Sequence, residues 1–424
     1  MKPEKVFKRY DIRGKYPEEL DEEFAERLGK ALGTFSAENF SEKVVVSRDR
    51  KDSSKPLKNA LIEGLKSSGI EVVDVGVGPT DYAAWCGKEK SCISIQVTSS
   101  HMPLNFNGFK FMYPEGNGFV NEDLYSIQDL FREQKFNSGQ GSVKEENLID
   151  KYKDEALEFA SNFNESPGKN IVFESMGGEA RILPELLEKQ SHNVVDISEK
   201  ERPYIDPPNP KPENLGRLEK KFEELDADLG LTFDLDADRI TVYHQDRFLT
   251  GDEIFSVLAQ LVDGEIVASI DTSKALEQFR EVDYTRVGDP FVMDEALEID
   301  AELAGEPNGH YSFTDFVPYN SGILAALIIS GLDLDEKLSN MPDYRIERDS
   351  IQVEEKHEVI EALKDEFGED IISDLDGVKF NYGNAEVLVR PSGSSPKVRI
   401  IAESREQVES KKALESVKES INQS

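Results

Sequence analysis

The sequence predicts an α/β protein with three related domains, followed by a smaller α+β domain. Three segments repeat one order: a β-branched run, a polar or glycine-rich loop, an apolar helical pattern and a second apolar run. This order is typical of βαβ units, which build mostly parallel sheets. The C-terminal part follows a different order, in which strands predominate. At roughly 150 residues per domain, 424 residues suggest about three domains, with two or four equally allowed.

The three repeats are widely spaced along the chain, and chance similarity among βα units is the alternative to three related domains. Their first runs are residues 44–46, 171–173 and 266–268. Their loops are residues 47–49, 176–178 and 271–273. Their helical patterns carry Leu57, Leu61 and Leu65; Leu183, Leu186 and Leu187; and a stretch ending at Phe279. Their second runs are residues 72–73, 194–195 and 285–287.

The C-terminal part predicts strands at residues 350–353, around 378, and at 387–389 and 398–401. Helices are expected over residues 359–367 and in the last segment, which carries Val408, Leu414, Val417 and Ile421. Polar stretches at residues 137–146, 246–251 and 340–343 predict the seams between domains. We therefore expect domains at residues 1–138, 139–247, 248–341 and 342–424.

The charge balance is strongly acidic. Eighty-five Asp and Glu against 50 Lys and Arg give a net charge of −35, which argues against a nucleic-acid or anionic-membrane surface and suits a salt-rich cell interior. Two cysteines, Cys86 and Cys92, exclude a disulfide scaffold and a four-thiolate zinc site, and we expect core thiols. There is no signal-peptide pattern, and the longest apolar stretch, residues 322–331, is too short to span a membrane. These features predict a cytoplasmic protein.

A first candidate site follows the strand-like residues 93–97. In Thr98-Ser99-Ser100-His101-Met102-Pro103, a hydroxyl is flanked by an imidazole, and Lys110 follows ten residues later. This is a plausible nucleophile with proton-transfer groups nearby. A polar turn rich in Ser and Asn is the simpler interpretation of the segment taken alone.

The second candidate, Asp234-Leu235-Asp236-Ala237-Asp238-Arg239, lies between the apolar runs 229–231 and 240–242. Alternating carboxylates on a near-extended segment would point to one side, which is costly without a cation. Three such oxygens with a substrate phosphate would suit Mg²⁺. Arg239 and Gln245 exclude an EF-hand. A phosphatase-type nucleophile and a solvated acidic turn are the alternatives.

Three further segments are weaker signals on their own. Residues 305–310, Gly-Glu-Pro-Asn-Gly-His, could hold sugar hydroxyls or form a simple turn. Residues 390–396, Arg-Pro-Ser-Gly-Ser-Ser-Pro, could cradle a phosphate with hydroxyls, backbone N–H groups and a guanidinium, or be a Pro/Gly turn. Near the N-terminus, residues 10–14, Tyr-Asp-Ile-Arg-Gly, place another guanidinium before a glycine.

In this order, the segments resemble the α-D-phosphohexomutase superfamily, in its phosphomannomutase/phosphoglucomutase branch. That family shows Tyr-Asp-Ile-Arg-Gly, a phosphoserine loop Thr-Ala-Ser-His-Asn-Pro, a metal loop Asp-Gly-Asp-Gly-Asp-Arg, a sugar loop Gly-Glu-Met-Ser-Gly-His and a phosphate loop Arg-Pro-Ser-Gly-Thr-Glu-Pro. The matching residues here are 10–14, 98–103, 234–239, 305–310 and 390–396. The resemblance implies four domains around a central cleft, the fourth similar to the TATA-box-binding protein.

The resemblance also implies a mutase that moves phosphate between the 1- and 6-positions of mannose or glucose through phosphorylated Ser100 and a hexose 1,6-bisphosphate. Ser100, Asp234, Asp236 and Asp238 would hold one Mg²⁺. The implied catalytic residues are Ser100, His101, Lys110, Arg13 and Arg239, with Lys110 and His101 unassigned between acid and base. The implied substrate-binding residues are Tyr10, Arg286, Asp289, Glu306, Asn308, His310, Arg390, Ser392, Gly393 and Ser394.

Departures from the family pattern bear on the sugar more than on the chemistry. Met102 replaces Asn, Asn308 replaces Ser and Ser395 replaces Glu. Phosphoglucosamine mutase is one alternative, although it usually shows Gln where this chain has Pro307. A non-catalytic sugar-phosphate-binding descendant and a phosphatase are the others. The expected partners are small sugar phosphates, and the sequence does not distinguish a monomer from a dimer.

Overall fold

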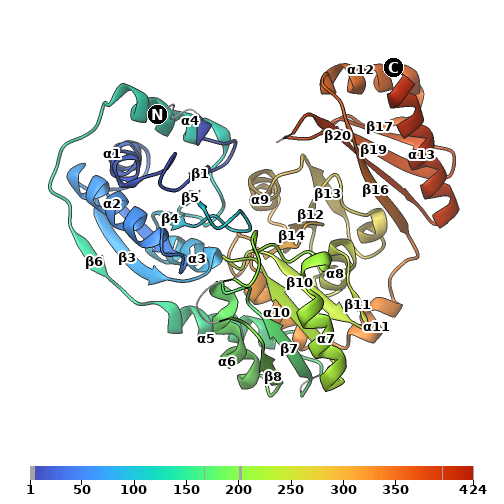
Figure 1. Cartoon of the computed structure of the whole chain (residues 1–424), viewed down its shortest axis with the longest axis horizontal. Helices are drawn as coiled ribbons and strands as arrows, with labels where there is room; N and C mark the ends of the chain where they lie inside the picture. Colours follow the sequence, from blue (N-terminus) through green and yellow to red (C-terminus); the bar gives the residue numbers. More distant parts are fainter. Residues whose placement is uncertain (1–4, 167, 200–202, 394, 424) are drawn as a thin grey trace.

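In the computed structural model, the chain forms three α/β domains and a C-terminal α+β domain, each built on its own sheet (Figure 1). The structure describes residues 5–166, 168–199, 203–393 and 395–423. In Figure 1 the first domain (blue) lies on the left, the second and third (green to orange) occupy the bottom and centre, and the fourth (red) lies at the upper right. The predicted fold class is therefore confirmed.

The first sheet has the order β1-β5-β4-β2-β3-β6. Strand β2 pairs in parallel with β3 and β4, whereas β5 is antiparallel to β4 and β1. Because β2 and β4 run in the same direction, the loops that follow them meet at one edge of the sheet. The strands are β1 Ile12–Lys15, β2 Lys43–Arg48, β3 Glu71–Val77, β4 Ile93–Val97, β5 Phe106–Met112 and β6 Val143–Glu145, and the helices are α1 Glu22–Asn39, α2 Ser54–Ser67, α3 Thr80–Lys90 and α4 Asn121–Glu133.

Strand β6 lies in the polar stretch that was expected to be a seam. It follows residue 138 and pairs in parallel with β3, so it extends the first sheet. We propose the expected domain ranges. Strand β6 falls within the expected second range, 139–247, although it belongs to the first sheet.

The second sheet has the order β11-β10-β9-β7-β8. Strand β7 pairs in parallel with β8 and β9, and β10 returns antiparallel to β9. The turn between β9 and β10 carries the candidate metal loop. The strands are β7 Asn170–Glu174, β8 Asn193–Asp196, β9 Leu229–Phe233, β10 Ile240–His244 and β11 Arg247–Phe248, with helices α5 Ile149–Ser161, α6 Leu183–Lys189 and α7 Gly216–Leu225 and the 3₁₀ segments η2 Glu179–Ile182 and η3 Pro212–Asn214.

The third sheet, β13-β12-β14-β15, differs from the prediction in two places. The helix expected before Phe279 is only the short 3₁₀ segment η4, and β13 ends at Thr285, so Arg286 lies beyond the strand. The strands are β12 Ile266–Ser269, β13 Val282–Thr285, β14 Leu303–Glu306 and β15 His310–Phe313, with α8 Gly251–Ala259, η4 Lys274–Gln278, α9 Asp289–Glu298, α10 Gly322–Ser330 and α11 Leu334–Ser339.

The fourth sheet, β16-β20-β19-β18-β17, is antiparallel throughout. Strand β17 was not expected from the sequence. The last helix contains Val408 as predicted, but its side chain is 73% exposed, whereas Leu414, Val417 and Ile421 are buried. The elements are β16 Arg345–Gln352, β17 Ile371–Ser373, β18 Val378–Tyr382, β19 Ala385–Pro391, β20 Lys397–Ser404, α12 Lys356–Phe367, η5 Gly368–Asp370 and α13 Gln407–Gln423.

The first three domains are held together through buried groups. One apolar cluster runs from β2 and α3 of the first domain through the second and third domains to α11. Within it, the carboxylate of Asp81 accepts hydrogen bonds from the Tyr152 hydroxyl (2.5 Å) and the Ser321 hydroxyl, which joins three domains at one point. Because a broken buried network leaves uncompensated polar groups, this contact favours a fixed arrangement of the three domains.

The fourth domain has a separate core and is attached by polar contacts. The Glu403 carboxylate accepts from the Ser273 hydroxyl and from the Lys274 backbone N–H (3.0 Å). Arg348 donates to Asp252 (2.7 Å). Side chains from β16 and β20 therefore connect this domain to the third one.

Both cysteines and the longest apolar stretch of the chain lie in the protein interior. Cys86 and Cys92 are buried free thiols, as predicted. The apolar helix α10 has nine residues, all buried. Over the described ranges of the chain, no helix has both the length and the apolar character required to cross a bilayer.

Candidate active site

Ser100 sits in a tight turn at the carboxyl end of β4. Its φ is 49°, and its backbone N–H donates to the Thr98 hydroxyl oxygen (3.0 Å). A non-glycine residue in the left-handed region is uncommon and is characteristic of residues that the surroundings hold in place. The Ser100 hydroxyl is 3.2 Å from His101 Nδ1 and donates to Asp234 Oδ2 (2.8 Å). The turn therefore presents the hydroxyl of a buried serine to the acidic loop of the second domain.

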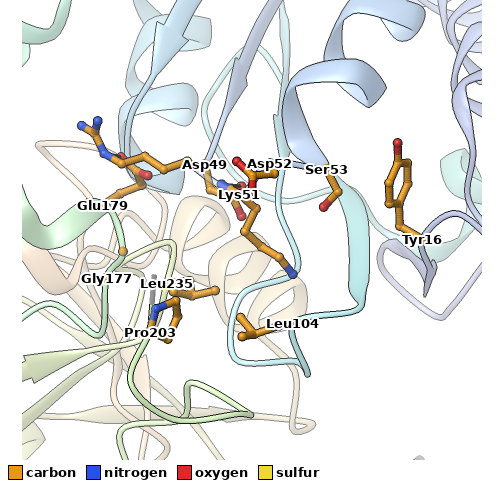
Figure 2. Close-up of a pocket in the computed structure, with 12 residues that line it drawn as sticks. Tyr16, Asp49, Lys51, Asp52, Ser53, Leu104, Gly177, Glu179, Pro203 and Leu235 are labelled. Atoms are coloured by element: carbon orange, nitrogen blue, oxygen red, sulfur yellow. Dashed lines mark hydrogen bonds and ion pairs between the residues drawn. The ribbon is translucent and has the colours of Figure 1, made fainter. Parts of the chain in front are cut away.

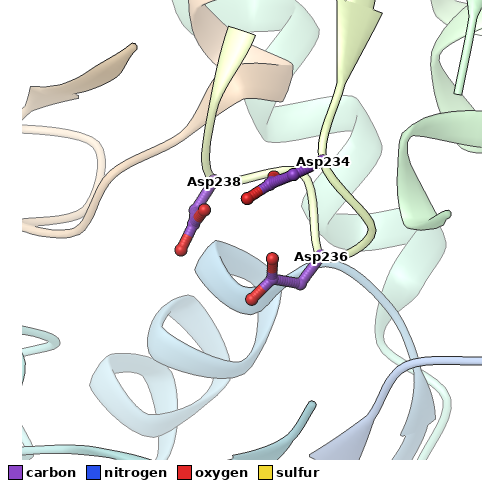
Figure 3. A group of neighbouring side chains, drawn as sticks. All are labelled: Asp234, Asp236 and Asp238. Atoms are coloured by element: carbon purple, nitrogen blue, oxygen red, sulfur yellow. The ribbon is translucent and has the colours of Figure 1, made fainter. Parts of the chain in front are cut away.

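Asp234, Asp236 and Asp238 are buried, and their carboxylates converge (Figure 3). One oxygen from each lies within 4.8 Å of the others. The expectation of a near-extended segment is wrong: the loop is a turn between β9 and β10, with Ala237 at a φ of 59°. In an extended strand, alternate side chains would point in parallel from one face. In this turn the backbone curves, so the three carboxylates point toward one another.

The triplet fits a divalent cation. Burial and the charges of Asp238 and Asp236 raise the pKa of Asp234 well above its usual value. Among the described residues, Asp236 Oδ1 and Asp238 Oδ1 have no hydrogen-bond partner despite being buried, and Asp238 Oδ1 lies 3.5 Å from His310 Nε2. Such oxygens are costly unless a cation or donor meets them, and hard carboxylate oxygens are the ligands Mg²⁺ prefers.

Lys110, on β5, supplies part of the missing positive charge. Its ammonium donates to Asp236 (2.8 Å) and to Asp238. Burial alone would lower the pKa of Lys110, but these two carboxylates outweigh it and raise the pKa well above its ordinary value. Lys110 is therefore an ammonium held against the acidic loop.

A pocket of about 100 Å³ brings four of the five candidate segments into contact. It joins the N-terminal segment, the serine turn and β5 of the first domain to the acidic loop of the second domain and to two loops of the third. Candidate residues that line it are Tyr10, Arg13, Ser100, Lys110, Asp238, Arg239, Asp289 and His310. Candidate residues that are up to 300 positions apart in the sequence therefore line the same pocket.

The segment 305–310 forms the turn between β14 and β15. Glu306 accepts from the Gly288 backbone N–H (2.9 Å) and lies 3.3 Å from His310 Nδ1. The Asn308 amide also donates to Glu306 (3.3 Å), and the Arg239 Nε–H donates to His310 Nε2 (3.0 Å). The turn is thus tied to the acidic loop through Arg239, which places its polar groups beside the pocket.

Arg286 and Asp289 flank Gly288 in the third domain, and only Asp289 lines the pocket. The Arg286 guanidinium lies over the ring of Phe291, 4.1 Å from its centre. Arg9 lies over the same ring at 5.1 Å. Two guanidinium groups therefore lie over the Phe291 ring, which is a favourable arrangement for cations, and this ring packs against Tyr10 of the pocket.

The segment 390–396 lies between β19 and β20 and does not line the pocket. Arg390 is 6% exposed and donates through Nε to Asp376 (2.9 Å). The Ser392 and Ser395 hydroxyls are 2.9 Å apart, and Lys356 donates to the Ser392 carbonyl (2.6 Å). Gly393 is exposed, and Ser394 lies outside the described residues.

A second cavity, of about 360 Å³, is lined by Leu104, which follows the serine turn, and by Leu235 of the acidic loop (Figure 2). The Lys51 ammonium, on the loop after β2, donates to the Ser99 hydroxyl oxygen (2.8 Å) and to the Phe106 carbonyl. On the opposite wall, the Glu179 backbone N–H donates to the Leu235 carbonyl (2.8 Å). The loop after β2 therefore contacts the serine turn, and the segment at Glu179 contacts the acidic loop.

Sequence reasoning did not select Lys51, Lys356 or Asp376. A signal existed for Lys51, because it follows β2, the parallel neighbour of β4, so its loop meets the serine turn at the same sheet edge. Lys356 and Asp376 are distant from residue 390 in the sequence and have no motif of their own. Asp376 meets Arg390 through the pairing of β18 with β19, and Lys356 meets Ser392 from the start of α12, so both contacts depend on the fold of the fourth domain.

Comparison with known proteins agrees with this geometry. The family profiles for phosphoglucomutase/phosphomannomutase match in chain order: alpha/beta/alpha domain I at residues 4–138, domain II at 150–247, domain III at 250–341 and the C-terminal domain at 350–420. A "phosphoglucomutase/phosphomannomutase" of Thermococcus kodakarensis is 31% identical over 443 residues, which covers 97% of this chain and 97% of the relative. The chain belongs to the α-D-phosphohexomutase superfamily.

Other phosphohexomutases show the same relation. A "probable phosphoglucosamine mutase" of Methanococcoides burtonii is 31% identical over 95% of this chain and 96% of its own length. A solved phosphoglucomutase/phosphomannomutase family protein from Burkholderia thailandensis superimposes with a TM-score of 0.87 at 24% identity, over 99% of this chain and 96% of the other. The relatives are named mutases, so this phosphohexomutase is an enzyme. Two relatives that are equally identical to it, at 31%, are named for different sugars.

Proposed function

We propose that this phosphohexomutase interconverts hexose 1-phosphate and hexose 6-phosphate, with Ser100 as the carrier of the phosphoryl group. The observation that supports this most is the buried Ser100 hydroxyl, held in a left-handed turn 2.8 Å from an oxygen of Asp234. A hydroxyl in this position can carry a phosphoryl group beside the acidic loop. A merely structural turn would not require the nucleophile and three converging carboxylates in one place.

In the first step, the free hydroxyl of the sugar phosphate attacks the phosphorus of phosphorylated Ser100. The bond between phosphorus and the serine oxygen breaks, the hydroxyl loses its proton, and a hexose 1,6-bisphosphate forms. We propose His101 and Lys110 for proton transfer, because His101 Nδ1 lies 3.2 Å from the Ser100 oxygen and Lys110 lies against the acidic loop. In the second step the bisphosphate turns, the Ser100 oxygen attacks the phosphorus of the other phosphate and loses its proton. The bond between that phosphorus and the sugar oxygen breaks, and the sugar oxygen takes up a proton.

Asp234, Asp236 and Asp238, with an oxygen of the phosphorylated Ser100, would hold Mg²⁺, which would neutralise charge on the transferred group. Arg13 and Arg239 line the same pocket, and we propose that their guanidinium groups hold the phosphoryl oxygens. Arg13 is itself oriented by an ion pair with Asp11 (2.6 Å).

The sugar and the phosphate that is not transferred would be held elsewhere. Glu306, Asn308 and His310 offer polar groups beside the pocket, and we propose that they bind the sugar hydroxyls. Tyr10 and Asp289 line the pocket, Arg286 lies over the nearby Phe291 ring, and we propose that these three residues complete the set. The segment with Arg390, Ser392, Gly393 and Ser394 would hold the distal phosphate in both orientations of the bisphosphate.

Mannose and glucose are the sugars we propose, and glucosamine is the alternative because relatives carry both kinds of name. A coupled assay that offers mannose 1-phosphate, glucose 1-phosphate and glucosamine 1-phosphate separately tests the choice. We expect turnover of one or both of the first two. Turnover of glucosamine 1-phosphate alone would reassign the sugar, and release of inorganic phosphate without isomerised sugar would indicate a phosphatase.

Replacing Arg390 with alanine should weaken the binding of hexose 1-phosphate and hexose 6-phosphate alike. Losing a charge-assisted contact with a buried partner costs about 2–5 kcal/mol. Phosphoserine content should be nearly unchanged, because Arg390 is outside the reaction pocket. KM for both substrates, with free bisphosphate quantified in solution, measures the effect. A rise in KM for only one substrate would show that residues 390–396 are not a shared phosphate anchor.

High salt should be tolerated or favourable. The substrate is an anion and the protein carries −35, so attraction depends on nearby Arg and Lys against a repulsive field of the whole molecule. The Debye length falls from about 10 Å at 0.1 M salt to about 3 Å at 1 M, which screens the distant repulsion before the contact pairs. Thermal stability and kcat/KM measured in 0.1 M and 1 M KCl should not fall. A steep loss of both would contradict this expectation.

A further inference from the structure

The Arg390 guanidinium is held in place by the turn that precedes β18. Asp376 accepts the Nε–H of Arg390 at 2.9 Å, and their side chains are only 18% and 8% exposed. Among the described residues, the bond from Nε to Asp376 is the one hydrogen bond found for the Arg390 guanidinium. A guanidinium fixed at Nε presents its two Nη groups as a fork, which is the geometry that binds two phosphate oxygens.

The contact is built into the backbone as well as the side chains. Gly377 follows Asp376 and has a φ of +121°. A Cβ atom at this position would lie 2.2 Å from the Val389 carbonyl oxygen and 2.8 Å from Arg390 Cα. Only glycine permits this close approach, so the Asp-Gly turn is pressed directly against the strand residue that it orients.

Two other segments of the chain lie within electrostatic reach of the Arg390–Asp376 pair. Burial raises the pKa of Asp271, and the nearby Arg390 charge opposes this shift. Burial also raises the pKa of Tyr10, with Asp376 among the charges that act on it. Asp271 of the third domain and Tyr10, which lines the pocket beside Ser100, are therefore within reach of the charges of this pair.

We propose that Asp376 is a positioning residue that preorganises Arg390 for the phosphate that is not being transferred. This rests on the proposed function. An anion that competed with phosphate would bind the Nη groups of Arg390. Asp376 instead accepts from Nε, so the Nη groups can bind phosphate oxygens. An arginine side chain that is already ordered loses less rotamer freedom when it binds, and this cost is about 0.5–1.5 kcal/mol for a long side chain. Removing Asp376 should therefore weaken binding of the phosphate that is not transferred, without affecting phosphoryl transfer at Ser100.

The test measures the Kd of mannose 6-phosphate and glucose 6-phosphate by calorimetry in a Ser100→Ala background, where no turnover occurs. Adding Asp376→Ala should raise both Kd values by roughly two- to twelvefold, which is the cost of ordering one arginine side chain converted to a ratio of dissociation constants. Asp376→Asn keeps an oxygen that can accept from Nε, so it should stay within about twofold of the reference. Asp374→Ala, an exposed residue of the same turn, is the matched control.

A double-mutant cycle separates positioning from folding. In an Arg390→Ala background, Asp376→Ala should change neither Kd, because the group it orients is gone. A further loss of affinity there would indicate a general structural role and overturn the proposal. Tighter binding in Asp376→Asn would show that the carboxylate competes with phosphate, which also overturns it, and this variant keeps the test decisive if Asp376→Ala does not fold. If the reference protein binds neither sugar phosphate, the proposed function fails and the inference fails with it.

Discussion

Ser100→Ala should reduce mutase turnover by at least about a thousandfold, because it removes the atom that carries the phosphoryl group. The fold should survive. Ser100 lies in a turn, and among the described residues its side chain forms hydrogen bonds with Asp234 and His101 alone, both of which belong to the site. The measurement is the steady-state rate with hexose 1-phosphate and a catalytic amount of hexose 1,6-bisphosphate, together with the melting temperature.

Ser94→Ala is the matched control for this substitution. Ser94 is also buried, lies in β4 six residues before Ser100, and has no hydrogen-bond partner for its hydroxyl among the described residues. We expect its activity to be near that of the unmodified enzyme. Full activity in Ser100→Ala would exclude a phosphoserine mechanism.

Asp236→Asn should lower activity by roughly a hundredfold or more, because an amide supplies neither the charge nor the strength of a carboxylate ligand. The substitution also weakens the ion pair with Lys110 (2.8 Å) and the hydrogen bond from the Thr80 hydroxyl (2.8 Å). Mg²⁺ affinity should fall in parallel, and this can be measured by calorimetry without turnover.

Two controls separate a metal effect from a general charge effect. Asp246→Asn removes an exposed carboxylate from the turn between β10 and β11, where a φ of 58° suits asparagine. It should leave activity and metal affinity unchanged. Full activity of the unmodified enzyme after verified metal removal in excess chelator would refute a role for the metal.

The regular parts of the fold could be predicted from the sequence because the apolar periods are strong. Runs such as residues 44–46 and 171–173 form buried strands, and the leucine spacing of Leu57, Leu61 and Leu65 forms α2. The prediction failed where the local signal was ambiguous. The stretch before Phe279 is a 3₁₀ segment, and the strand after it ends before Arg286.

The candidate site was visible as five separate segments, and the motif order was the signal that united them. What could not be predicted depends on contacts between distant segments. Lys51 supports Ser99 from a loop 48 residues earlier, and Asp376 meets Arg390 because β18 pairs with β19. Neither residue belongs to a motif. Lys51 had only the signal that its loop follows β2, the parallel neighbour of β4, and Asp376 had none, so tertiary structure alone identifies the Asp376 contact. The curvature of the acidic loop around its three carboxylates has the same origin.

The central claim is that Ser100 carries phosphate and transfers it to sugar. Intact mass and peptide mapping of the enzyme after incubation with hexose 1,6-bisphosphate test this most directly. We expect one phosphate, located on Ser100, that is lost when excess hexose 6-phosphate is added and reappears in solution as bisphosphate. An enzyme that interconverts the two hexose phosphates at full rate while Ser100 stays unmodified would contradict the account.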